Sequence, residues 1–157
     1  MSAPVDHLII REAREEDVPA LAALFAADGI GGHGDTTDEA ALPDYIAAFR
    51  AIAVSPNEAL YVAECEGEVV GTFQTAIVTK LVGRGAVSMI IEAVQTRADM
   101  RGRGIGARMI GHCIEEAKRR GLASVQLTSN VARVDAHRFY ERLGFERRHL
   151  GFRMKLK

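Results

Sequence analysis

Cysteine is scarce in this chain, which holds only Cys65 and Cys113 among its 157 residues. A small secreted scaffold held by several disulfides is therefore excluded. We expect two unpaired apolar cysteines, with a single disulfide as the alternative. Long apolar runs are also lacking, since none approaches the roughly 18 residues of a membrane-spanning helix. The N-terminal stretch MSAPVDHLIIREARE shows no secretory signal, so we expect a cytoplasmic protein with no membrane partner.

An excess of charge of either sign is also missing, because 20 Lys and Arg residues face 21 Asp and Glu residues. The net charge of −1 gives no overall attraction to nucleic acid, so we expect no nucleic-acid partner. A polyanionic ligand would need a local basic site. Hydrophobic residues at 48% and charged residues at 26% suit a globular protein, and residues 1–157 are expected to form a single domain.

Hydrophobic periodicity predicts a mixed α/β fold with the order β-α-α-β-β-β-α-β-α-β-β. A first helix is expected to be capped by Asp17 and ended by Gly29. One parallel crossover should join the central strand to the strand after the third helix. The other helices are expected at 38–53, 105–120 and 133–143, and the strands at 7–13, 60–64, 69–78, 86–96, 124–128, 145–148 and 151–156.

The segment GIGGHGDTTDEA, residues 29–40, has four glycines in its first six positions. Such a segment predicts a mobile loop, and loops of this kind often border the substrate site of a small enzyme. A plain connector is an equally good interpretation.

The segment MRGRGIGARM, residues 100–109, places three glycines and two arginines where a helix begins. Amide N–H groups at a helix N-terminus have no partner within the helix and bind phosphate well. Glycine lets a ligand approach the backbone, and the arginines add positive charge. The segment therefore predicts a phosphate cradle, although it matches neither the P-loop pattern GxxxxGK[ST] nor GxGxxG. A purely structural turn is the alternative.

RGRGIG resembles the first signature of the GNAT superfamily of acyl-CoA-dependent N-acetyltransferases, and AHRFYERLGFE, residues 136–146, resembles the second. The resemblance implies a mostly antiparallel central sheet with helices on both faces, splayed by a bulge at the middle strands. It implies acetyl-CoA as co-substrate, held by loop, strand and downstream residues. These are Arg101, Gly102, Arg103, Gly104, Ile105 and Gly106 for the pyrophosphate, and Val94, Gln95, Thr96 and Asn130 for the pantetheine arm.

Acetyl transfer to an amine needs a proton acceptor, a polarised carbonyl and a stabilised leaving thiolate. Glu92, within the apolar segment SMIIEAVQT, is the candidate base, because burial there would raise the pKa of its carboxyl. A surface residue or an anchor for the substrate ammonium are the alternatives. The resemblance implies that Tyr140 protonates the leaving sulfur and that the Val94 amide polarises the carbonyl. Packing alone is the alternative for Tyr140.

The segment TSNVARVDAHRFY, residues 128–140, resembles a subgroup of the family that includes aminoalkylphosphonate N-acetyltransferase. This implies a small primary amine with an anionic tail as acceptor. The alternatives are a protein N-terminus or lysine as acceptor, or a non-catalytic acyl-CoA-binding module in place of an enzyme.

The five histidines show no zinc spacing, so no metal is expected, and only His33 and Asp35 form a pair of interest. A homodimer is expected only because dimers are the commonest assembly.

Overall fold

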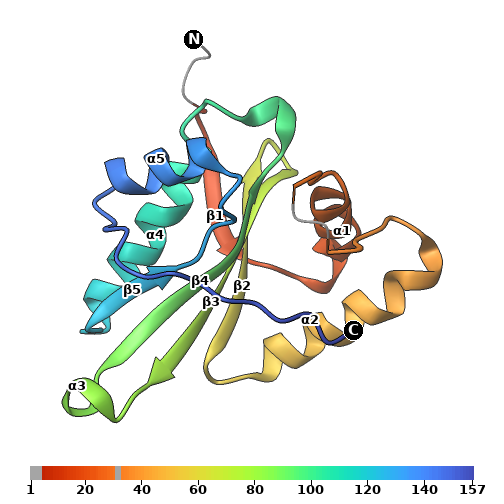
Figure 1. Ribbon diagram of the computed structural model, residues 1–157. Coiled ribbons are helices and arrows are strands. Elements are labelled where there is room, and N and C mark those ends of the chain that lie inside the picture. Colours follow the sequence, from red (N-terminus) through yellow and green to blue (C-terminus); the bar gives the residue numbers. More distant parts are fainter. Residues whose placement is uncertain (1–4, 31–32) are drawn as a thin grey trace. The chain divides into compact units, whose positions relative to one another are not determined.

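The computed structural model describes residues 5–30 and 33–157, which divide into two compact units at Leu127/Thr128 (Figure 1). Gly31 and Gly32 of the predicted loop lie outside the described residues. The second unit, Thr128–Lys157, contains α5 (Val134–Arg142). The first unit contains β1 (Leu8–Glu12), η1 (Glu15–Asp17), α1 (Val18–Ala26), η2 (Glu39–Ala41), α2 (Leu42–Val54), β2 (Glu58–Cys65), β3 (Glu68–Thr79), α3 (Val82–Gly85), β4 (Val87–Thr96), η3 (Ala98–Met100), α4 (Ile105–Arg119) and β5 (Ser124–Leu127).

The five strands form one sheet in chain order, with β1 to β4 antiparallel and β5 parallel to β4. Helices α1 and α2 lie against one face of the sheet and α4 against the other (Figure 1). Successive side chains of β2 point to opposite faces of the sheet. Val62 packs with α1 on one face, and Tyr61 contacts His112 of α4 on the other. The expected mixed α/β fold is confirmed, including the parallel crossover from β4 through α4 to β5.

Helix α4 forms because its apolar residues recur at helical spacing on one side. Five of them are buried, namely Ile105, Met109, Ile110, Cys113 and Ala117, and Ile114 is half-buried. Lys118 and Arg119 occupy the last turn, where positive charge stabilises a helix C-terminus. Burial raises the pKa of Cys113 to about 12, so its thiol stays protonated at neutral pH. Cys113 and Cys65 are both free, as expected.

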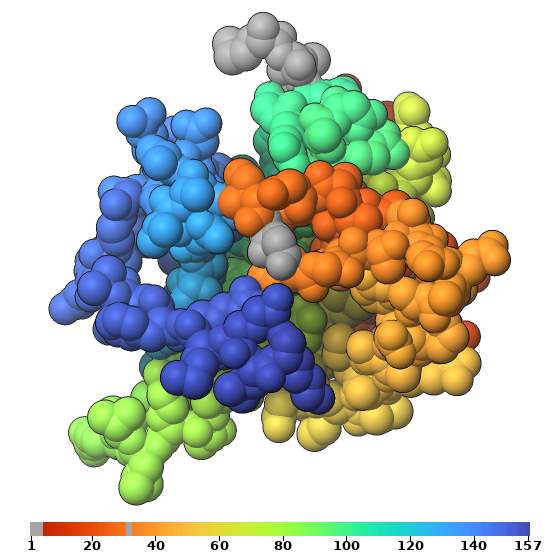
Figure 2. All heavy atoms as spheres, turned by 45° about the vertical axis from the view of Figure 1, so that its right-hand side comes forward, coloured from red at the N-terminus to blue at the C-terminus, as the bar shows by residue number. Residues whose placement is uncertain are grey.

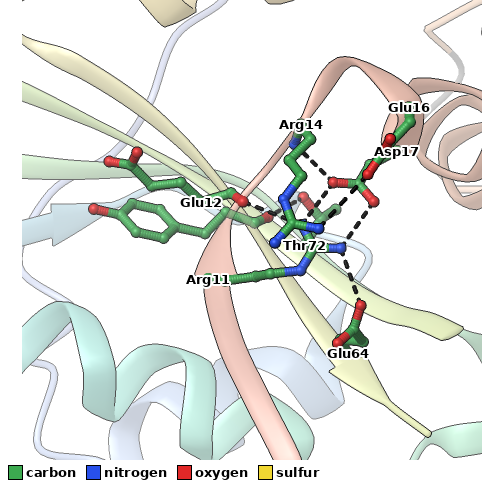
Figure 3. Close-up of polar contacts among 8 residues, drawn as sticks. Arg11, Glu12, Arg14, Glu16, Asp17, Glu64 and Thr72 are labelled. Atoms are coloured by element: carbon green, nitrogen blue, oxygen red, sulfur yellow. Dashed lines mark hydrogen bonds and ion pairs between the residues drawn. The ribbon is translucent and has the colours of Figure 1, made fainter. Parts of the chain in front are cut away.

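A partly buried ion cluster ties β1 to the start of α1 and to β2 (Figure 3). Arg11 donates from Nη1 and Nη2 to the two Asp17 carboxylate oxygens, at 2.8 and 2.9 Å, and also to Glu64 at 3.1 Å. The Asp17 carboxylate further accepts the Arg14 backbone N–H at 2.7 Å. Asp17 is only 7% exposed, and these partners, Arg11 first, lower its pKa. Its predicted role as a helix cap is wrong, because its side chain is held by residues before the helix and not by the α1 amides.

Replacing Asp17 by Asn is expected to lower the free energy of unfolding by about 2 kcal/mol, because Arg11 loses its bidentate partner in a buried place. Urea unfolding followed by circular dichroism measures the change. Glu15→Gln is the matched control, since the Glu15–Arg50 pair at 2.7 Å is exposed, and exposed ion pairs add little to stability. Equal losses for both variants would contradict the prediction.

The contribution of the Asp17 carboxylate to the free energy of unfolding should also depend on pH. Because folding lowers the pKa of this carboxyl, its stabilisation is complete above the unfolded value of about 3.9. It is lost as the pH falls through the lower folded value. The stability difference between wild type and Asp17→Asn should therefore be constant at neutral pH and shrink below about pH 4. A difference that does not shrink as the pH falls below about 4 would contradict this assignment.

The segment before α2 is fixed to that helix. The Tyr45 hydroxyl donates to Asp35 Oδ1 at 2.7 Å and accepts the Thr36 N–H at 3.1 Å. Asp38 caps η2 by accepting the Ala40 N–H, and α2 begins at Leu42, later than predicted. Figure 2 shows this segment and α2, in orange to yellow, as a continuous surface of the first unit. These hydrogen bonds join Asp35, Thr36 and Asp38 to α2 and η2, and the predicted mobility of the loop stays a prediction.

The second unit consists of a turn, α5 and an extended C-terminal segment. The strands predicted at 145–148 and 151–156 are wrong, since no residue from 145 to 157 belongs to a strand. The alternating apolar residues of the second predicted strand are exposed: Phe152, Met154 and Leu156. Alternation gives a segment an apolar side, but a strand also needs a neighbouring backbone to pair with.

Across both units, no described helix is long and apolar enough to cross a membrane.

Candidate active site

Strand β4 contains a bulge at its middle. Thr72 of β3 pairs with Gln95 and Gln74 pairs with Glu92, so Phe73 alone lies opposite Ala93 and Val94. Ala93 takes a left-handed φ of 52°, as the extra residue of a bulge can. The sequence did not show this bulge, which only the family resemblance implied, and the structure confirms it.

The bulge marks the point where β4 separates from β5. Upstream, Ser88 and Ser124 are partners whose hydroxyls lie 2.8 Å apart, and the parallel register ends at Ile91 and Leu127. Strand β4 continues to Thr96 without a β5 partner. The expected splaying of the middle strands is therefore present in the first unit.

Beyond Ile91, β4 has a free edge on the side away from β3. The direction of its backbone hydrogen bonds shows which amides on this edge are free to bind a ligand. The Arg97 N–H donates to the Val70 carbonyl at 2.8 Å, toward β3. Groups on alternate residues of a strand point the same way, so Gln95 also faces β3. Val94 and Thr96 then direct their amides to the opposite edge, where β5 has ended. This edge can accept an extended ligand that pairs in the manner of a strand.

The glycine-rich loop follows β4 directly and ends on α4. Gly102 and Gly104 have φ values of 74° and 83°, which side chains other than glycine rarely adopt. Gly104 is the N-cap of α4 without a side-chain cap, and its carbonyl accepts the Arg108 N–H at 3.1 Å. The amides of the first turn, including Ile105 and Gly106, thus have no partner within the helix. A Cβ added to Gly102 or Gly104 would meet no atom within 4 Å, so the space beside the loop is open.

Three arginines bring positive charge to this loop. Arg101 Nε donates to the Thr96 carbonyl at 3.2 Å, which joins the loop to the free end of β4. Arg103 contacts Met100, and Arg108 donates to the Leu8 carbonyl at 3.2 Å. A hollow of about 290 Å³ borders Arg103, Gly104 and Arg108. Arg108 was not among the predicted site residues. The sequence held a signal for it, because it is a third arginine within the glycine-rich segment RGRGIGAR, residues 101–108. Open space, helix amides and guanidinium groups together suit a phosphate group.

Replacing Gly104 by Val is expected to weaken acetyl-CoA binding about tenfold, because a β-branched residue resists this φ and would distort the cap by about 1–2 kcal/mol. Calorimetric titration with acetyl-CoA measures the change. Gly111→Ala is the control, since Gly111 lies inside α4 with an ordinary φ and open space around it. Unchanged affinity in Gly104→Val would show that the loop does not hold the ligand.

Glu92 occupies the last β4 position before the bulge and is exposed. The expectation that it is buried is therefore wrong. The reason is the strand alternation, which turns the preceding Ile91 into the core and Glu92 outward. No described group forms an ion pair with Glu92 in the structure, so its carboxylate is available to a substrate. Its two suggested roles, base and ammonium anchor, are both compatible with this position.

Asn130 and Tyr140 belong to the second unit. The side-chain oxygen of Asn130 accepts the Ala132 N–H at 2.9 Å. The backbone carbonyl oxygen of Asn130 lies 2.8 Å from His137 Nε2. Asn130 thus shapes the turn that precedes α5. The Tyr140 ring lies edge-on to Phe139 at 5.1 Å and to Phe145 at 5.9 Å. These contacts orient the ring on α5.

Metal ligands do not gather in the structure. Among residues 5–30 and 33–157, no group of three or more His, Cys, Asp or Glu side chains could hold a metal ion. Asp35, from the pair of interest named above, instead accepts the Tyr45 hydroxyl.

Comparison with known proteins gives a consistent result. Residues 11–145 match the family described as "Acetyltransferase (GNAT) family". The chain is 35% identical over 104 residues to the aminoalkylphosphonate N-acetyltransferase of Salmonella typhimurium. This match covers 66% of this chain and 67% of that protein.

Two solved structures are also similar. A transcriptional regulator from Bacillus halodurans C-125 has a TM-score of 0.91 at 37% identity, over 96% of this chain and 100% of that chain. A putative acetyltransferase from Agrobacterium tumefaciens C58 has a TM-score of 0.80 at 31% identity, over 94% and 99%.

More distant structures share the fold. An aminoglycoside N-acetyltransferase solved with CoA has a TM-score of 0.76 at 17% identity. A predicted acetyltransferase from Clostridium acetobutylicum solved with acetyl-CoA has a TM-score of 0.72 at 18% identity. Together with the site described above, the family match shows that this chain belongs to the acetyltransferase (GNAT) family, whose members are acyl-CoA-dependent N-acetyltransferases.

Proposed function

We propose that this protein transfers the acetyl group of acetyl-CoA to the primary amine of a small molecule by direct attack. The observation that carries the proposal is the juxtaposition of the free β4 edge with the glycine-rich start of α4, joined by the Arg101–Thr96 contact. The loop amides and arginines would hold the pyrophosphate. The outward amides of Val94 and Thr96 would pair with the pantetheine arm, and Gln95 supports them through its pairing with β3.

The chemistry falls to three groups of the chain. An alkyl amine with a pKa of about 10.4 must lose a proton before it can attack, and Glu92 would accept that proton, directly or through water. The Val94 N–H would stabilise the negative charge that develops on the carbonyl oxygen. Tyr140 would donate a proton to the departing sulfur. Asn130 would contact the pantetheine arm.

The acceptor class is supported by the relative named above. Because that protein is called an aminoalkylphosphonate N-acetyltransferase, we propose a small primary amine that carries an anionic group. The similarity covers about two thirds of each chain. We also propose that residues 1–157 act as one domain, since the family match runs through both units. The two free thiols support a cytoplasmic location, and a homodimer is expected on general grounds.

The first experiment is thermal unfolding with acetyl-CoA, CoA, ATP and NAD, each over a range of concentrations. A ligand at about 100 times its Kd adds roughly 2.7 kcal/mol of stability, which is a visible shift. A shift that is largest with acetyl-CoA supports the proposal. Thiol release with aminoalkylphosphonates, simple alkylamines and lysine peptides then ranks the acceptors. Stabilisation by ATP or NAD alone would overturn the proposed function, and a preference for peptides would overturn the acceptor class.

A further inference from the structure

Gln74 of β3 lies directly opposite Glu92 in the pairing of β3 with β4. Opposed residues of an antiparallel pair direct their side chains to the same face of the sheet, with Cβ atoms about 5 Å apart. Gln74 is half-buried, whereas Glu92 is exposed. The carboxylate proposed as the base therefore has a carboxamide as its direct neighbour on β3.

The neighbours of Gln74 show which face of the sheet this is. Phe73, which precedes it on β3, contacts the His112 ring of α4 at 5.9 Å. Because successive side chains of a strand alternate, Gln74 points to the other face, against which α1 and α2 lie. Its partner on β2, Leu60, packs on this face against a cluster that includes buried residues of α1. Gln74 and Glu92 thus share the α1 side of the sheet.

The carboxamide of Gln74 is available to a substrate. Its side chain forms no hydrogen bond within residues 5–30 and 33–157, and none joins it to Glu92. Gln126, a glutamine of β5, instead donates to the Ser124 hydroxyl at 3.3 Å. A carboxamide carries two N–H donors, whereas an ionised carboxylate only accepts. Together, Glu92 and Gln74 therefore offer an acceptor for an ammonium group and a donor for an oxygen atom.

The residues around Gln74 direct a polar group toward its carboxamide. Leu60 on β2 and Ala76, two residues further along β3, border it on the same face, and both are half-buried and apolar. Their side chains offer a polar group no hydrogen bond. A hydrogen bond from an amide to an ionised oxygen is stronger than one between neutral groups. An anionic substituent therefore gains more from Gln74 than a hydroxyl does, and an alkyl group gains nothing.

We propose that Gln74 selects and positions the acceptor, an inference that rests on the proposed function. Its carboxamide N–H donates to an oxygen of the acceptor's polar substituent, while Glu92 receives the proton of the amine. Glutamine and glutamate side chains are equally long, so their polar ends lie about one strand spacing, roughly 4.8 Å, apart. An amine with two carbons between its nitrogen and a phosphonate group has the length to contact both.

Steady-state thiol release with two acceptors, 2-aminoethylphosphonate and propylamine, tests this role. Wild type is expected to prefer the phosphonate. Gln74→Met keeps the length of the side chain and removes the carboxamide, so kcat/KM for the phosphonate should fall about tenfold, mainly through KM. The value for propylamine, which has no oxygen to contact, should stay within about twofold. Gln126→Met is the same substitution on a glutamine bonded to Ser124, and as the control it should change neither value.

The two acceptors separate recognition from a structural effect, because damage to β3 would lower both values alike. Equal losses with both amines would overturn the role of Gln74, and so would an equal change of preference in Gln126→Met. Wild-type turnover with an unchanged preference in Gln74→Met would overturn this role alone and leave the proposed function intact. No wild-type turnover of any amine, together with no stabilisation by acetyl-CoA, would overturn the proposed function and the role of Gln74 with it.

Discussion

Replacing Glu92 by Gln is expected to lower kcat by about 10²- to 10³-fold while the KM for acetyl-CoA stays nearly constant. The amide has the shape of the carboxylate but cannot accept the proton of the attacking ammonium. The position supports this role, because Glu92 is exposed, has no described ion-pair partner, and lies two residues before the outward amide of Val94. Steady-state rates with the best acceptor from the amine screen measure the effect.

The pH dependence separates the two roles of Glu92. If it is the base, kcat of the wild type falls at low pH as the carboxylate is protonated, and this acid limb disappears in Glu92→Gln. If it is only an anchor for the ammonium, the variant raises the KM for the amine and leaves kcat in place. Glu115→Gln is the control for removing one exposed carboxylate. An unaltered kcat and pH profile would remove Glu92 from the mechanism.

Local signals made the glycine-rich loop and α4 predictable. The glycines before α4 and the buried stripe from Ile105 to Ala117 lie next to one another in the sequence, and each follows from backbone conformation or helical spacing. The structure therefore reproduces the loop, the helix and the crossover within a residue or two.

The bulge could not be read from the residues, because it is a property of the pairing between two strands. Nothing in IIEAVQT marks Ala93, a non-glycine residue, for a φ of 52°. The extra residue exists only relative to Phe73 on β3. The same limitation applies to the Arg11–Glu64 contact, which joins residues 53 positions apart. It also explains why the strands predicted at 145–148 and 151–156 are wrong. Alternation is a local pattern, whereas pairing needs a backbone from elsewhere in the chain.

Tyr140→Phe is expected to lower kcat about 10²-fold with little change in the affinity for acetyl-CoA. The substitution removes only the hydroxyl, and the ring contacts with Phe139 and Phe145 remain possible for phenylalanine. Thermal unfolding of the variant measures separately whether loss of the hydroxyl changes stability.

The chemistry of the leaving group gives the sharper test of Tyr140. A thiolate from CoA has a conjugate acid pKa of about 8.5, so it needs a proton less as the pH rises. The rate deficit of Tyr140→Phe should then be largest at neutral pH and smaller above about pH 9. An acyl donor with a more acidic thiol should also reduce the deficit, because its thiolate leaves without protonation. If the deficit is absent, or does not depend on the donor thiol, Tyr140 serves packing in α5 and another group or water supplies the proton.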